Sequence, residues 1–426
     1  MTPSTFRAMK PPCPFLFLLA YLAIIADVDA AFRAGIAMRV VTPDPLLPVS
    51  GGVGPSNPVS RKEGELTVRA LVFERDNVRV AIVSADFLGF PAVLGDRVRA
   101  AIKSIPPENI LIGATHTHSA PDCYGFPDGK GGTASDPKYL AGVCARMAEA
   151  IEEAVTKLQR ARIKVATGEA KGRIAYNYYA EQLYDPRCHV IQALDDAGQP
   201  IATLVNYAIH PEVLGSKAGV CSPDLIGPLY DRLSEKGGGI GLFMNSAQGG
   251  MVTADNRKSD KGENRDWNEC LRIGTLLADE SLRLIQDAPI QESPSLFCAA
   301  RAITFPVDSP LMQALFKQLP RPGTNASNNA IATRLNLINL GNAQIVTIPG
   351  EALPNIGYYL KRKMRGEHNL LFGLCNDAFG YILTKEDFDS FKRYAYVSRT
   401  SLGERTGEIL VNELLKLVAD CPAPKR

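Results

Sequence analysis

Short apolar runs alternate with longer amphipathic stretches over most of the chain. Runs of apolar, often β-branched residues bounded by turn residues predict buried strands, whereas apolar positions that recur every three or four residues predict helices. The pattern predicts strands over residues 79–85, 109–114, 190–194, 201–208, 240–245, 333–340, 343–348 and 370–374. It predicts helices over residues 92–104, 139–158, 223–234, 267–287, 353–364 and 407–419.

The order of these elements favours one α/β domain. Strands that alternate with helices are typical of a layered architecture in which helices pack on a sheet. Stretches rich in Gly and Asp at 125–136 and 259–264 predict loops. Because no internal sequence repeat or low-complexity linker interrupts the chain, we expect a single mixed-sheet α/β domain over residues 31–426.

The N-terminal pattern predicts export. Arg7 and Lys10 precede the apolar run 15–26, and the small residues of 28–30 are suited to cleavage. A basic start, a short apolar run and small residues are typical of a secretory signal peptide, and this run is too short for a comfortable membrane span. We therefore expect a signal peptide over residues 1–30, a mature start near Ala31 and a secreted or periplasmic protein, with a retained anchor as the alternative.

Composition excludes one class of partner and leaves the redox state open. The net charge is +2 and no long basic run occurs, so nothing in the chain indicates nucleic-acid binding. Eight cysteines follow the predicted signal peptide, an even number that permits disulfides in an exported protein. Their pairing cannot be derived from spacing, and none forms the Cys-x-x-Cys pattern of a zinc ribbon.

The clearest chemical signal is a pair of histidines in a chain that has only five. His116 and His118 directly follow the predicted strand 109–114. Side chains at positions i and i+2 of a strand point to the same face, so we expect the two imidazoles to project together. Imidazole is both a common metal ligand and a general base near neutral pH. The motif favours a metal-dependent hydrolytic site over the alternative of two histidines bonded to backbone carbonyls.

Three further candidates also stand where predicted strands end. His210 closes the run 205–209 and precedes Pro211, which cannot continue a strand ladder. Ser246 enters a small-residue turn, where backbone can approach a ligand closely but where serine is also common. Glu351 follows a strand-like run and a Pro-Gly turn, and its alternative role is a first-turn partner of the helix dipole.

The set of motifs resembles the neutral/alkaline, non-lysosomal ceramidases. The matching segments occur in the order seen in that family and span most of the mature chain. They are 34–43, THTHS at 115–119, NYAIHP at 206–211, NSAQGG at 245–250, PGE at 349–351, and the stretch 379–394 from FGYI to KRY.

The resemblance implies a zinc site held by four residues of this chain. They are His116, His210, Glu351 and Tyr381. Imidazole nitrogen and carboxylate oxygen are common zinc donors, and a phenol oxygen is chemically suited as well. Without the family, Tyr381 would be assigned to the core.

The resemblance also implies four residues around the reacting centre. His118 would face the centre without binding zinc, Ser246 would act as nucleophile or position the substrate, and Tyr394 would stabilise the oxyanion. Tyr394 lies one residue further from Tyr381 than the family spacing. Arg173 matches a substrate-contacting arginine, with an exposed loop arginine as the alternative.

The implied reaction is hydrolysis of N-acylsphingosine or a related N-acyl amide or ester. Zinc would polarise the scissile carbonyl and lower the pKa of bound water. The implied partner is a small-molecule or lipid amide, with peripheral contact to a membrane surface. Metallo-β-lactamase-like and amidohydrolase folds fit less well, because Ser119 and Ala120 follow the histidines and few further histidines remain.

Two departures from the family leave a second interpretation open. Gly250 stands where the family usually has a carboxylate, and the chain ends soon after its last predicted helix, so we expect no C-terminal immunoglobulin-like domain. A secreted, non-catalytic binding protein on the same scaffold is therefore the alternative function.

Overall fold

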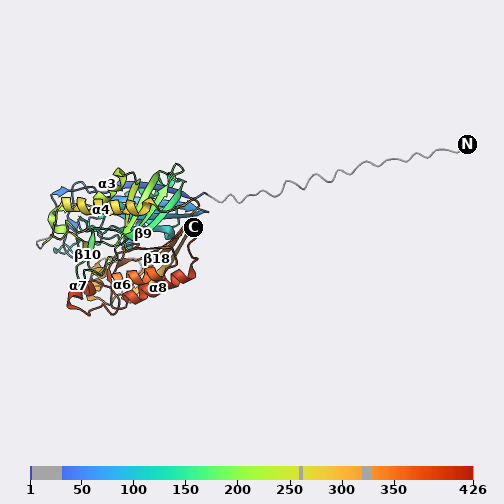
Figure 1. Ribbon diagram of the computed structural model, residues 1–426. Helices are drawn as coiled ribbons and strands as arrows, with labels where there is room; N and C mark the ends of the chain where they lie inside the picture. Colours follow the sequence, from blue (N-terminus) through green and yellow to red (C-terminus); the bar gives the residue numbers. More distant parts are fainter. Residues whose placement is uncertain (2–30, 259–261, 319–328, 426) are drawn as a thin grey trace. The chain divides into compact units, whose positions relative to one another are not determined.

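The computed structural model describes residues 1, 31–258, 262–318 and 329–425. The predicted signal peptide and part of the predicted loop 259–264 lie outside these residues. Residues 31–426 are grouped into one compact unit. Within it, three sheets surround a shared apolar core, and helices cover the outer face of each sheet (Figure 1). The predicted mixed-sheet α/β architecture is confirmed.

The first sheet has the strand order β6-β5-β4-β1-β8 and is covered by α1 and α2. Its edge strand β6 runs parallel to β5, and the other pairs are antiparallel. The elements are β1 (Arg33–Val40), β4 (Thr67–Arg75), β5 (Val78–Ala85), α1 (Ala92–Ala101), β6 (Ile110–Ala114), α2 (Pro137–Thr156) and β8 (Gln159–Arg160).

The second sheet repeats this plan with the order β14-β12-β11-β9-β16, again with a parallel pair at one edge. Helices α3 and α4 cover it, and Figure 1 shows α4 lying along the strands. The elements are β9 (Arg162–Glu169), β11 (Arg187–Leu194), β12 (Pro200–Tyr207), α3 (Ile226–Glu235), β14 (Ile240–Asn245), α4 (Trp267–Gln286) and β16 (Ile290–Gln291).

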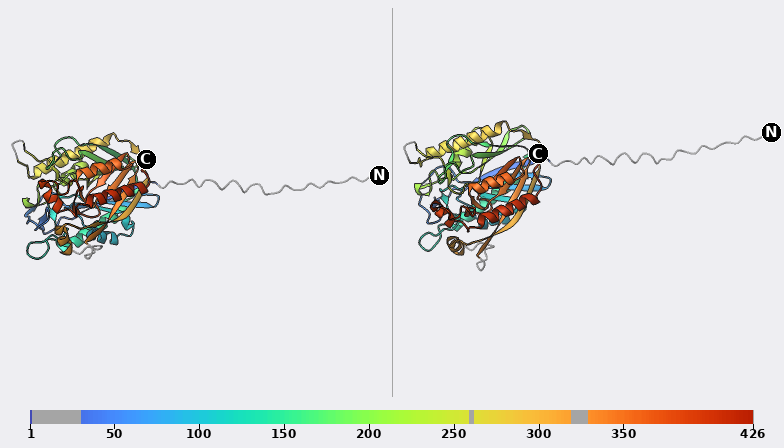
Figure 2. Two further views of the ribbon diagram at one scale, coloured as in Figure 1. Left: turned by 90° about the horizontal axis from the view of Figure 1, so that it is seen from below. Right: turned by 60° about the horizontal axis from the view of Figure 1, so that its bottom comes forward.

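The third sheet has the order β17-β18-β19-β21, with β21 parallel to β19. Helices α6 and α8 lie side by side over it (Figure 2), and α5 joins the same apolar cluster. The elements are β17 (Leu296–Pro306), α5 (Pro310–Gln318), β18 (Ala330–Leu340), β19 (Ala343–Thr347), α6 (Pro354–Lys363), β21 (His368–Phe372) and α8 (Thr406–Asp420).

Short ribbons and turns connect the three sheets near one end. Four strand pairs are β2 (Val49–Ser50) with β7 (Ala120–Pro121), β3 (Arg61–Lys62) with β13 (Val220–Cys221), β10 (Ala175–Asn177) with β15 (Val252–Ala254), and β20 (Gly350–Ala352) with β22 (Phe379–Ile382). The remaining elements are α7 (Ala395–Arg399) and 3₁₀ turns at Pro107–Asn109, Ser216–Ala218 and Lys392–Tyr394.

The sequence pattern explains why the sheets are buried on both faces. Along β5, Val80 and Ile82 point into the shared core, whereas Ala81 and Val83 face α1 and α2. This alternation follows from the two-residue period of a strand. Strands covered on both faces carry nearly continuous apolar runs, which is why β5, β6, β12 and β14 were predictable.

Each predicted strand and helix has a counterpart, with shifts at its ends. The helix predicted over 92–104 ends at Ala101, and that predicted over 223–234 begins at Ile226. Strands β4, β9 and β17 and helix α5 were not predicted. The loop predicted over 125–136 is confirmed. All eight cysteines in the described residues are free thiols, and seven of them are buried.

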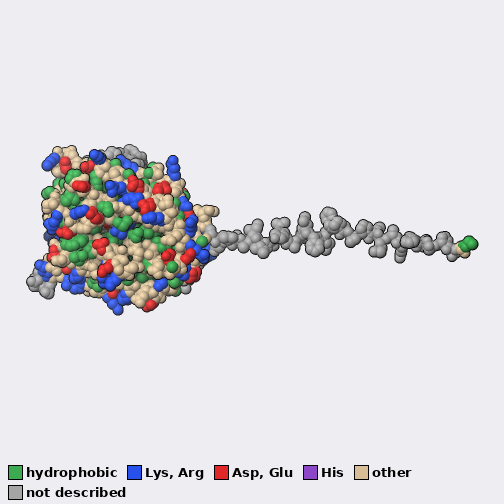
Figure 3. Space-filling view, turned by 90° about the horizontal axis from the view of Figure 1, so that it is seen from above, with side chains coloured by type: hydrophobic (Ala, Val, Ile, Leu, Met, Phe, Trp, Pro, Cys, Tyr) green, Lys and Arg blue, Asp and Glu red, His purple; other side chains and the backbone are tan. Residues whose placement is uncertain are grey.

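The described part of the chain contains no helix with the length and apolar character needed to cross a membrane. On the face shown in Figure 3, Lys and Arg side chains are interspersed with Asp and Glu. That mixture agrees with the net charge of +2 and gives this face no extended basic area.

Candidate metal centre and active site

The carboxyl ends of the parallel edge pairs of the three large sheets meet at one place. Gly373, just after β21, donates its N–H to the carbonyl of Asn245 at the end of β14, at 2.9 Å. The Asn245 side-chain amide donates to Thr115 O at 3.1 Å and to Ile209 O at 2.7 Å. One buried amide therefore links the residues that precede His116 and His210.

His116 lies outside the strand that leads to it. Strand β6 ends at Ala114, and His116 has a left-handed backbone with φ of 74°. The expectation that strand alternation brings His116 and His118 together is wrong, because a left-handed residue turns the chain between them. The two imidazoles still converge, with their Nε2 atoms 3.3 Å apart.

Each of the three site histidines has its Nδ1 facing an oxygen that can only accept. His116 Nδ1 donates to Leu88 O at 2.5 Å and His210 Nδ1 donates to Val252 O at 2.7 Å. His118 Nδ1 lies 3.5 Å from the Oε2 atom of Glu212. In a neutral imidazole, a protonated Nδ1 leaves Nε2 as an acceptor.

Two of the Nε2 atoms face a buried carboxylate, and the third, that of His118, faces His116 Nε2. Glu351 Oε2 lies 3.1 Å from His210 Nε2 and 3.4 Å from His116 Nε2. One nitrogen from each of the three imidazoles lies within 4.8 Å of the others. Acceptors brought this close require shared protons or a cation. Imidazole nitrogen and carboxylate oxygen are also the donor types that Zn²⁺ takes, so these residues fit a metal ion.

Burial and neighbouring charges shift the pKa values of three residues of this group. Burial alone would raise the pKa of Glu351, but His116 and His210 outweigh it and lower the pKa well below its usual range. Burial lowers the pKa of His118 to about 3. Burial also acts to lower the pKa of His210, yet the hydrogen bond and charge of Glu351 raise it above its ordinary value.

Glu351 and Tyr381 are neighbours across a two-stranded ribbon. They are partners in the parallel register of β20 and β22. Helix α6 begins only at Pro354, so Glu351 is a strand residue and not a first-turn partner of the helix dipole. Tyr381 is 7% exposed, and its hydroxyl donates to Met251 Sδ at 3.4 Å. Burial raises the pKa of Tyr381 well above its ordinary value.

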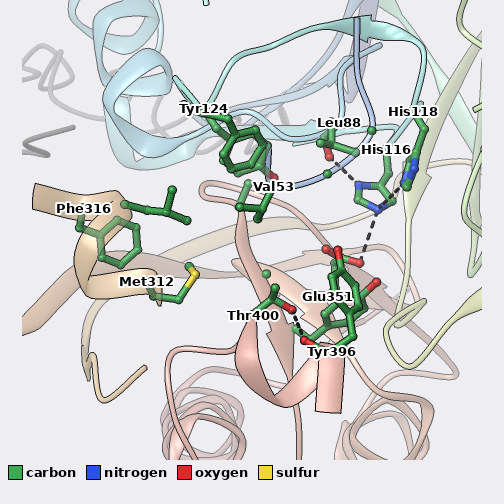
Figure 4. A pocket seen from close by; sticks show the side chains of 17 residues that line it. Val53, Leu88, His116, His118, Tyr124, Met312, Phe316, Glu351, Tyr396 and Thr400 are labelled. Carbon is green, nitrogen blue, oxygen red and sulfur yellow. Dashed lines mark hydrogen bonds and ion pairs between the residues drawn. The ribbon is translucent and has the colours of Figure 1, made fainter. Parts of the chain in front are cut away.

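A pocket opens onto this group. Its polar end holds His116, His118, Glu351 and Tyr381. Figure 4 shows Met312 and Phe316 of α5 across the pocket from the histidines. The remaining lining residues are Gly51, Gly52, Val53, Leu88, Tyr124, Phe126, Leu315, Ala378, Gly380, Tyr396 and Thr400. The pocket is therefore apolar with one polar end, the usual composition of a small-molecule site.

Four residues implied by the resemblance do not line the pocket. His210 is one of them, and it contacts the site through Glu351, with its Nε2 atom 3.1 Å from Glu351 Oε2. The Ser246 hydroxyl is buried and has no hydrogen-bond partner among the described residues. Arg173 is an exposed residue whose guanidinium forms an ion pair with Asp255 at 3.5 Å. Tyr394 packs against Tyr179, with ring centroids 5.6 Å apart.

The serine turn nevertheless supports the site from behind. Gly249 follows Ser246 closely and donates its N–H to Ala352 O at 2.9 Å. A Cβ atom on Gly249 would lie 2.2 Å from Glu351 O, so only glycine permits this approach. The sequence predicted that another group approaches this small-residue turn closely. The group that does so is the backbone of β20, and not a ligand.

Sequence reasoning missed two polar residues of the site. Tyr396 lines the pocket beside Glu351 (Figure 4), and its ring centroid lies 5.9 Å from that of Tyr381. Burial, with the negative charge of Glu351, raises the pKa of Tyr396 to about 12. The local sequence does not show which of Tyr394 and Tyr396 lines the pocket. Glu212 follows His210 and Pro211 directly, and that adjacency was its only sequence signal.

Neither a family model nor a curated protein matches the chain. The chain is similar to solved structures, among them two ceramidases. The neutral ceramidase from Pseudomonas aeruginosa has a TM-score of 0.73 at 15% identity, covering 93% of this chain and 76% of that one. A ceramidase complexed with C2 has a TM-score of 0.70 at 16% identity, with the same coverage. The resemblance inferred from the sequence motifs is thus confirmed at the level of the fold, and the chain has a neutral ceramidase-like fold.

Proposed function

We propose that this chain is an exported, zinc-dependent hydrolase of N-acyl amides, with N-acylsphingosine or a related acyl amide or ester as substrate. The observation that carries the proposal is the convergence of three imidazole Nε2 atoms and the Glu351 carboxylate at the end of an apolar pocket. The ceramidase-like fold supports the choice of an acyl amide over other hydrolysable bonds.

His116, His210 and Glu351 would hold the ion, and Tyr381, the cross-strand partner of Glu351, is the proposed fourth ligand. When bound, Zn²⁺ supplies Lewis-acid polarisation of a carbonyl and lowers the pKa of water. The backbone carbonyls of Leu88 and Val252 hold the Nδ1–H atoms of His116 and His210, which keeps both Nε2 atoms directed at the centre.

Two further side chains are suited to proton transfer and charge stabilisation. His118 presents Nε2 to the centre and would accept a proton from water and return it to the leaving amine. We assign oxyanion stabilisation to Tyr396, because its side chain lines the pocket, and not to Tyr394, which packs against Tyr179. A phenol is protonated at neutral pH, as a donor must be, and the raised pKa of Tyr396 extends this state to more alkaline pH.

The proposal gives Ser246 and Arg173 supporting roles. The Ser246 hydroxyl is buried outside the pocket, so we place this residue in the turn that packs behind Glu351 and not in nucleophilic attack. Arg173 is held by Asp255 in an exposed loop. Neither residue contacts the pocket, and we expect neither to contact a substrate within it.

The pocket supports an acyl substrate. Met312 and Phe316 lie across the pocket from the histidines, and with Phe126 and Leu315 they give the pocket an apolar wall that is suited to an aliphatic or aromatic acyl group. A substrate with its acyl chain against this wall would present its carbonyl to the polar end. Contact with a membrane surface, where such lipids reside, is part of the proposal.

One observation favours the non-catalytic alternative. Gly250 has φ of 68°, and a Cβ atom there would lie 3.0 Å from Leu353 Cγ. A carboxylate-bearing residue at this position would be strained, so the backbone has adapted to glycine. A binding protein that retained the metal and lost turnover would carry such a change.

Metal analysis paired with hydrolysis assays tests the proposal. We expect about one zinc per chain in the purified protein and release of fatty acid from N-acylsphingosine or a simpler N-acyl amide. Stoichiometric zinc without turnover of any acyl amide or ester would favour the binding protein. Absence of zinc together with unchanged hydrolysis after chelation would overturn the metal assignment. The mature N-terminus, read by mass spectrometry of exported protein, tests cleavage near Ala30.

A further inference from the structure

His118 differs from the other two site histidines in what orients it. Backbone carbonyls accept the Nδ1–H of His116 and His210, but the Nδ1 atom of His118 faces a side-chain carboxylate. That carboxylate belongs to Glu212, whose Oε2 atom lies 3.5 Å from His118 Nδ1. His118 is therefore the one histidine of this group whose Nδ1 atom faces an ionisable partner.

Glu212 is itself held in place. The Thr253 hydroxyl donates to Glu212 Oε1 at 2.7 Å, so the second carboxylate oxygen is free to face His118. The backbone contributes as well, because His118 N–H donates to Pro211 O at 3.1 Å. The two side chains are only 14% and 25% exposed, respectively, which shields their interaction from water.

This arrangement selects one tautomer of His118. A carboxylate opposite Nδ1 favours a proton on that nitrogen, which leaves Nε2 as an acceptor. Nε2 is the atom 3.3 Å from His116 Nε2. Without a carboxylate acceptor, neutral histidine would distribute its proton between the two nitrogens.

We propose that Glu212 is a positioning residue that fixes His118 in the Nδ1–H tautomer and directs its Nε2 lone pair at the candidate centre, with Thr253 as the anchor of the carboxylate. The catalytic consequence rests on the proposed hydrolase function. The tautomer itself does not, because it is a property of the protein before any substrate binds.

Histidine NMR tests the proposal directly, since the chain has only five histidines. Long-range ¹H–¹⁵N correlation spectra of the ¹⁵N-labelled, metal-free full chain at mildly alkaline pH report which nitrogen of each imidazole carries the proton. The spectrum of His118→Gln assigns the His118 signals. We expect the Nδ1–H pattern for His118 in the wild type.

Glu212→Gln is the informative variant. Because Thr253 would still donate to the side-chain oxygen, the Gln amide would present N–H groups to His118 Nδ1 and favour the opposite tautomer. The matched control is Glu367→Gln, which alters a carboxylate 3.9 Å from His368 and should leave the His118 signals unchanged. An unchanged His118 tautomer in Glu212→Gln would overturn the proposal.

Kinetics and metal content separate this inference from the proposed function. We expect Glu212→Gln to retain its zinc and to lose roughly 10- to 100-fold in kcat, the range for partners of site histidines, with KM changed less. Should Glu212→Gln fail to fold, Thr253→Val removes only the anchor, and an unchanged tautomer and kcat there would overturn the proposal. A tautomer shift in a protein without hydrolase activity would leave the positioning role standing and reject the function.

Discussion

The five histidines fall into two groups, each with at least one fully buried member, whose hydrogen bonds are arranged differently. His116, His118 and His210 gather around Glu351 at the end of a pocket. His189 and His368 belong instead to a hydrogen-bond chain centred on Lys361. Burial is common to both groups, so burial alone does not indicate a site.

The second group is a closed network. Lys361 Nζ donates to Asp185 Oδ2 and to His189 Nε2, each at 2.9 Å. His189 Nδ1 then donates to Thr167 Oγ1 at 2.8 Å, and that hydroxyl donates to His368 Nδ1 at 2.9 Å. Along this chain each donor meets one acceptor, and the lysine charge is balanced by Asp185.

In the first group, hydrogen-bond acceptors outnumber donors. The Nδ1 atoms face acceptor oxygens outside the centre, while the Nε2 atoms face each other and the Glu351 carboxylate. A buried excess of acceptors is costly unless protons or a cation neutralise it. The direction of the hydrogen bonds therefore distinguishes a candidate metal centre from a structural histidine cluster.

Removal of a histidine from the first group should give the largest effect. We expect His116→Ala and His210→Ala to be purified without zinc and to lose more than about 100-fold in kcat/KM, since even partners of metal ligands contribute 10- to 100-fold. The matched control is His368→Gln, which should keep its zinc and its activity. Equal zinc content in all three variants would remove the distinction between the groups.

The second group should respond in stability and not in metal binding. Lys361→Met leaves the buried Asp185 carboxylate with Arg187 as its remaining charged partner, and we expect a loss of about 3 kcal/mol in the free energy of unfolding. Urea unfolding measures that loss, and metal analysis should show zinc unchanged. If Lys361→Met lost zinc but kept its stability, Lys361 would belong to the first group and not to the second.

Tyr396 extends the first group, whereas Tyr394 does not. We expect Tyr396→Phe to lower kcat by about 100-fold, the effect of removing an oxyanion donor, with zinc retained. Tyr394→Phe removes only a hydroxyl from a ring that packs against Tyr179, and kcat should stay within about twofold. If Tyr394→Phe lowered kcat more than Tyr396→Phe did, oxyanion stabilisation would be assigned to Tyr394.

The smallest expected effect is the acid sensitivity of the second group. Burial acts to raise the pKa of Asp185, but Lys361 and Arg187 outweigh it and lower the pKa well below its ordinary value. The carboxylate therefore stabilises the fold above its unfolded pKa of about 3.9, and this stabilisation is lost as pH falls further. Asp185→Asn should have a lower free energy of unfolding than the wild type at neutral pH. On acidification, its free energy of unfolding should fall by roughly 1 kcal/mol less than that of the wild type, as urea unfolding at several pH values would show.

The sequence predicted the parts of the fold that hydrophobic periodicity controls. Strands β5, β6, β12 and β14 are nearly continuous apolar runs because both of their faces are covered, and their ends located His116, His210 and Ser246. Strand β4 was missed because it contains the charged residues Arg69 and Glu74. Each of the three large sheets has a parallel strand pair at one edge. This shared strand order could not be predicted, because the sequence contains no corresponding repeat.

The candidate site was less predictable because it depends on backbone direction and long-range contacts. The left-handed backbone at His116, and not strand alternation, brings its imidazole toward His118. The start of a short helix decides that Tyr396, and not Tyr394, reaches the pocket. Glu212 and His118 are 94 residues apart in sequence (212 − 118), so no local pattern could pair them.

We infer that the Nε2 atoms of His116 and His210 and the Glu351 carboxylate bind a metal ion. Anomalous diffraction from a crystal of the zinc-loaded protein tests it most directly. We predict one strong zinc peak between His116, His210 and Glu351, about 2.0–2.2 Å from their ligand atoms, and the same map would show whether Tyr381 completes the site. No peak at this position, or a peak only among residues of the Lys361 network, would contradict the account.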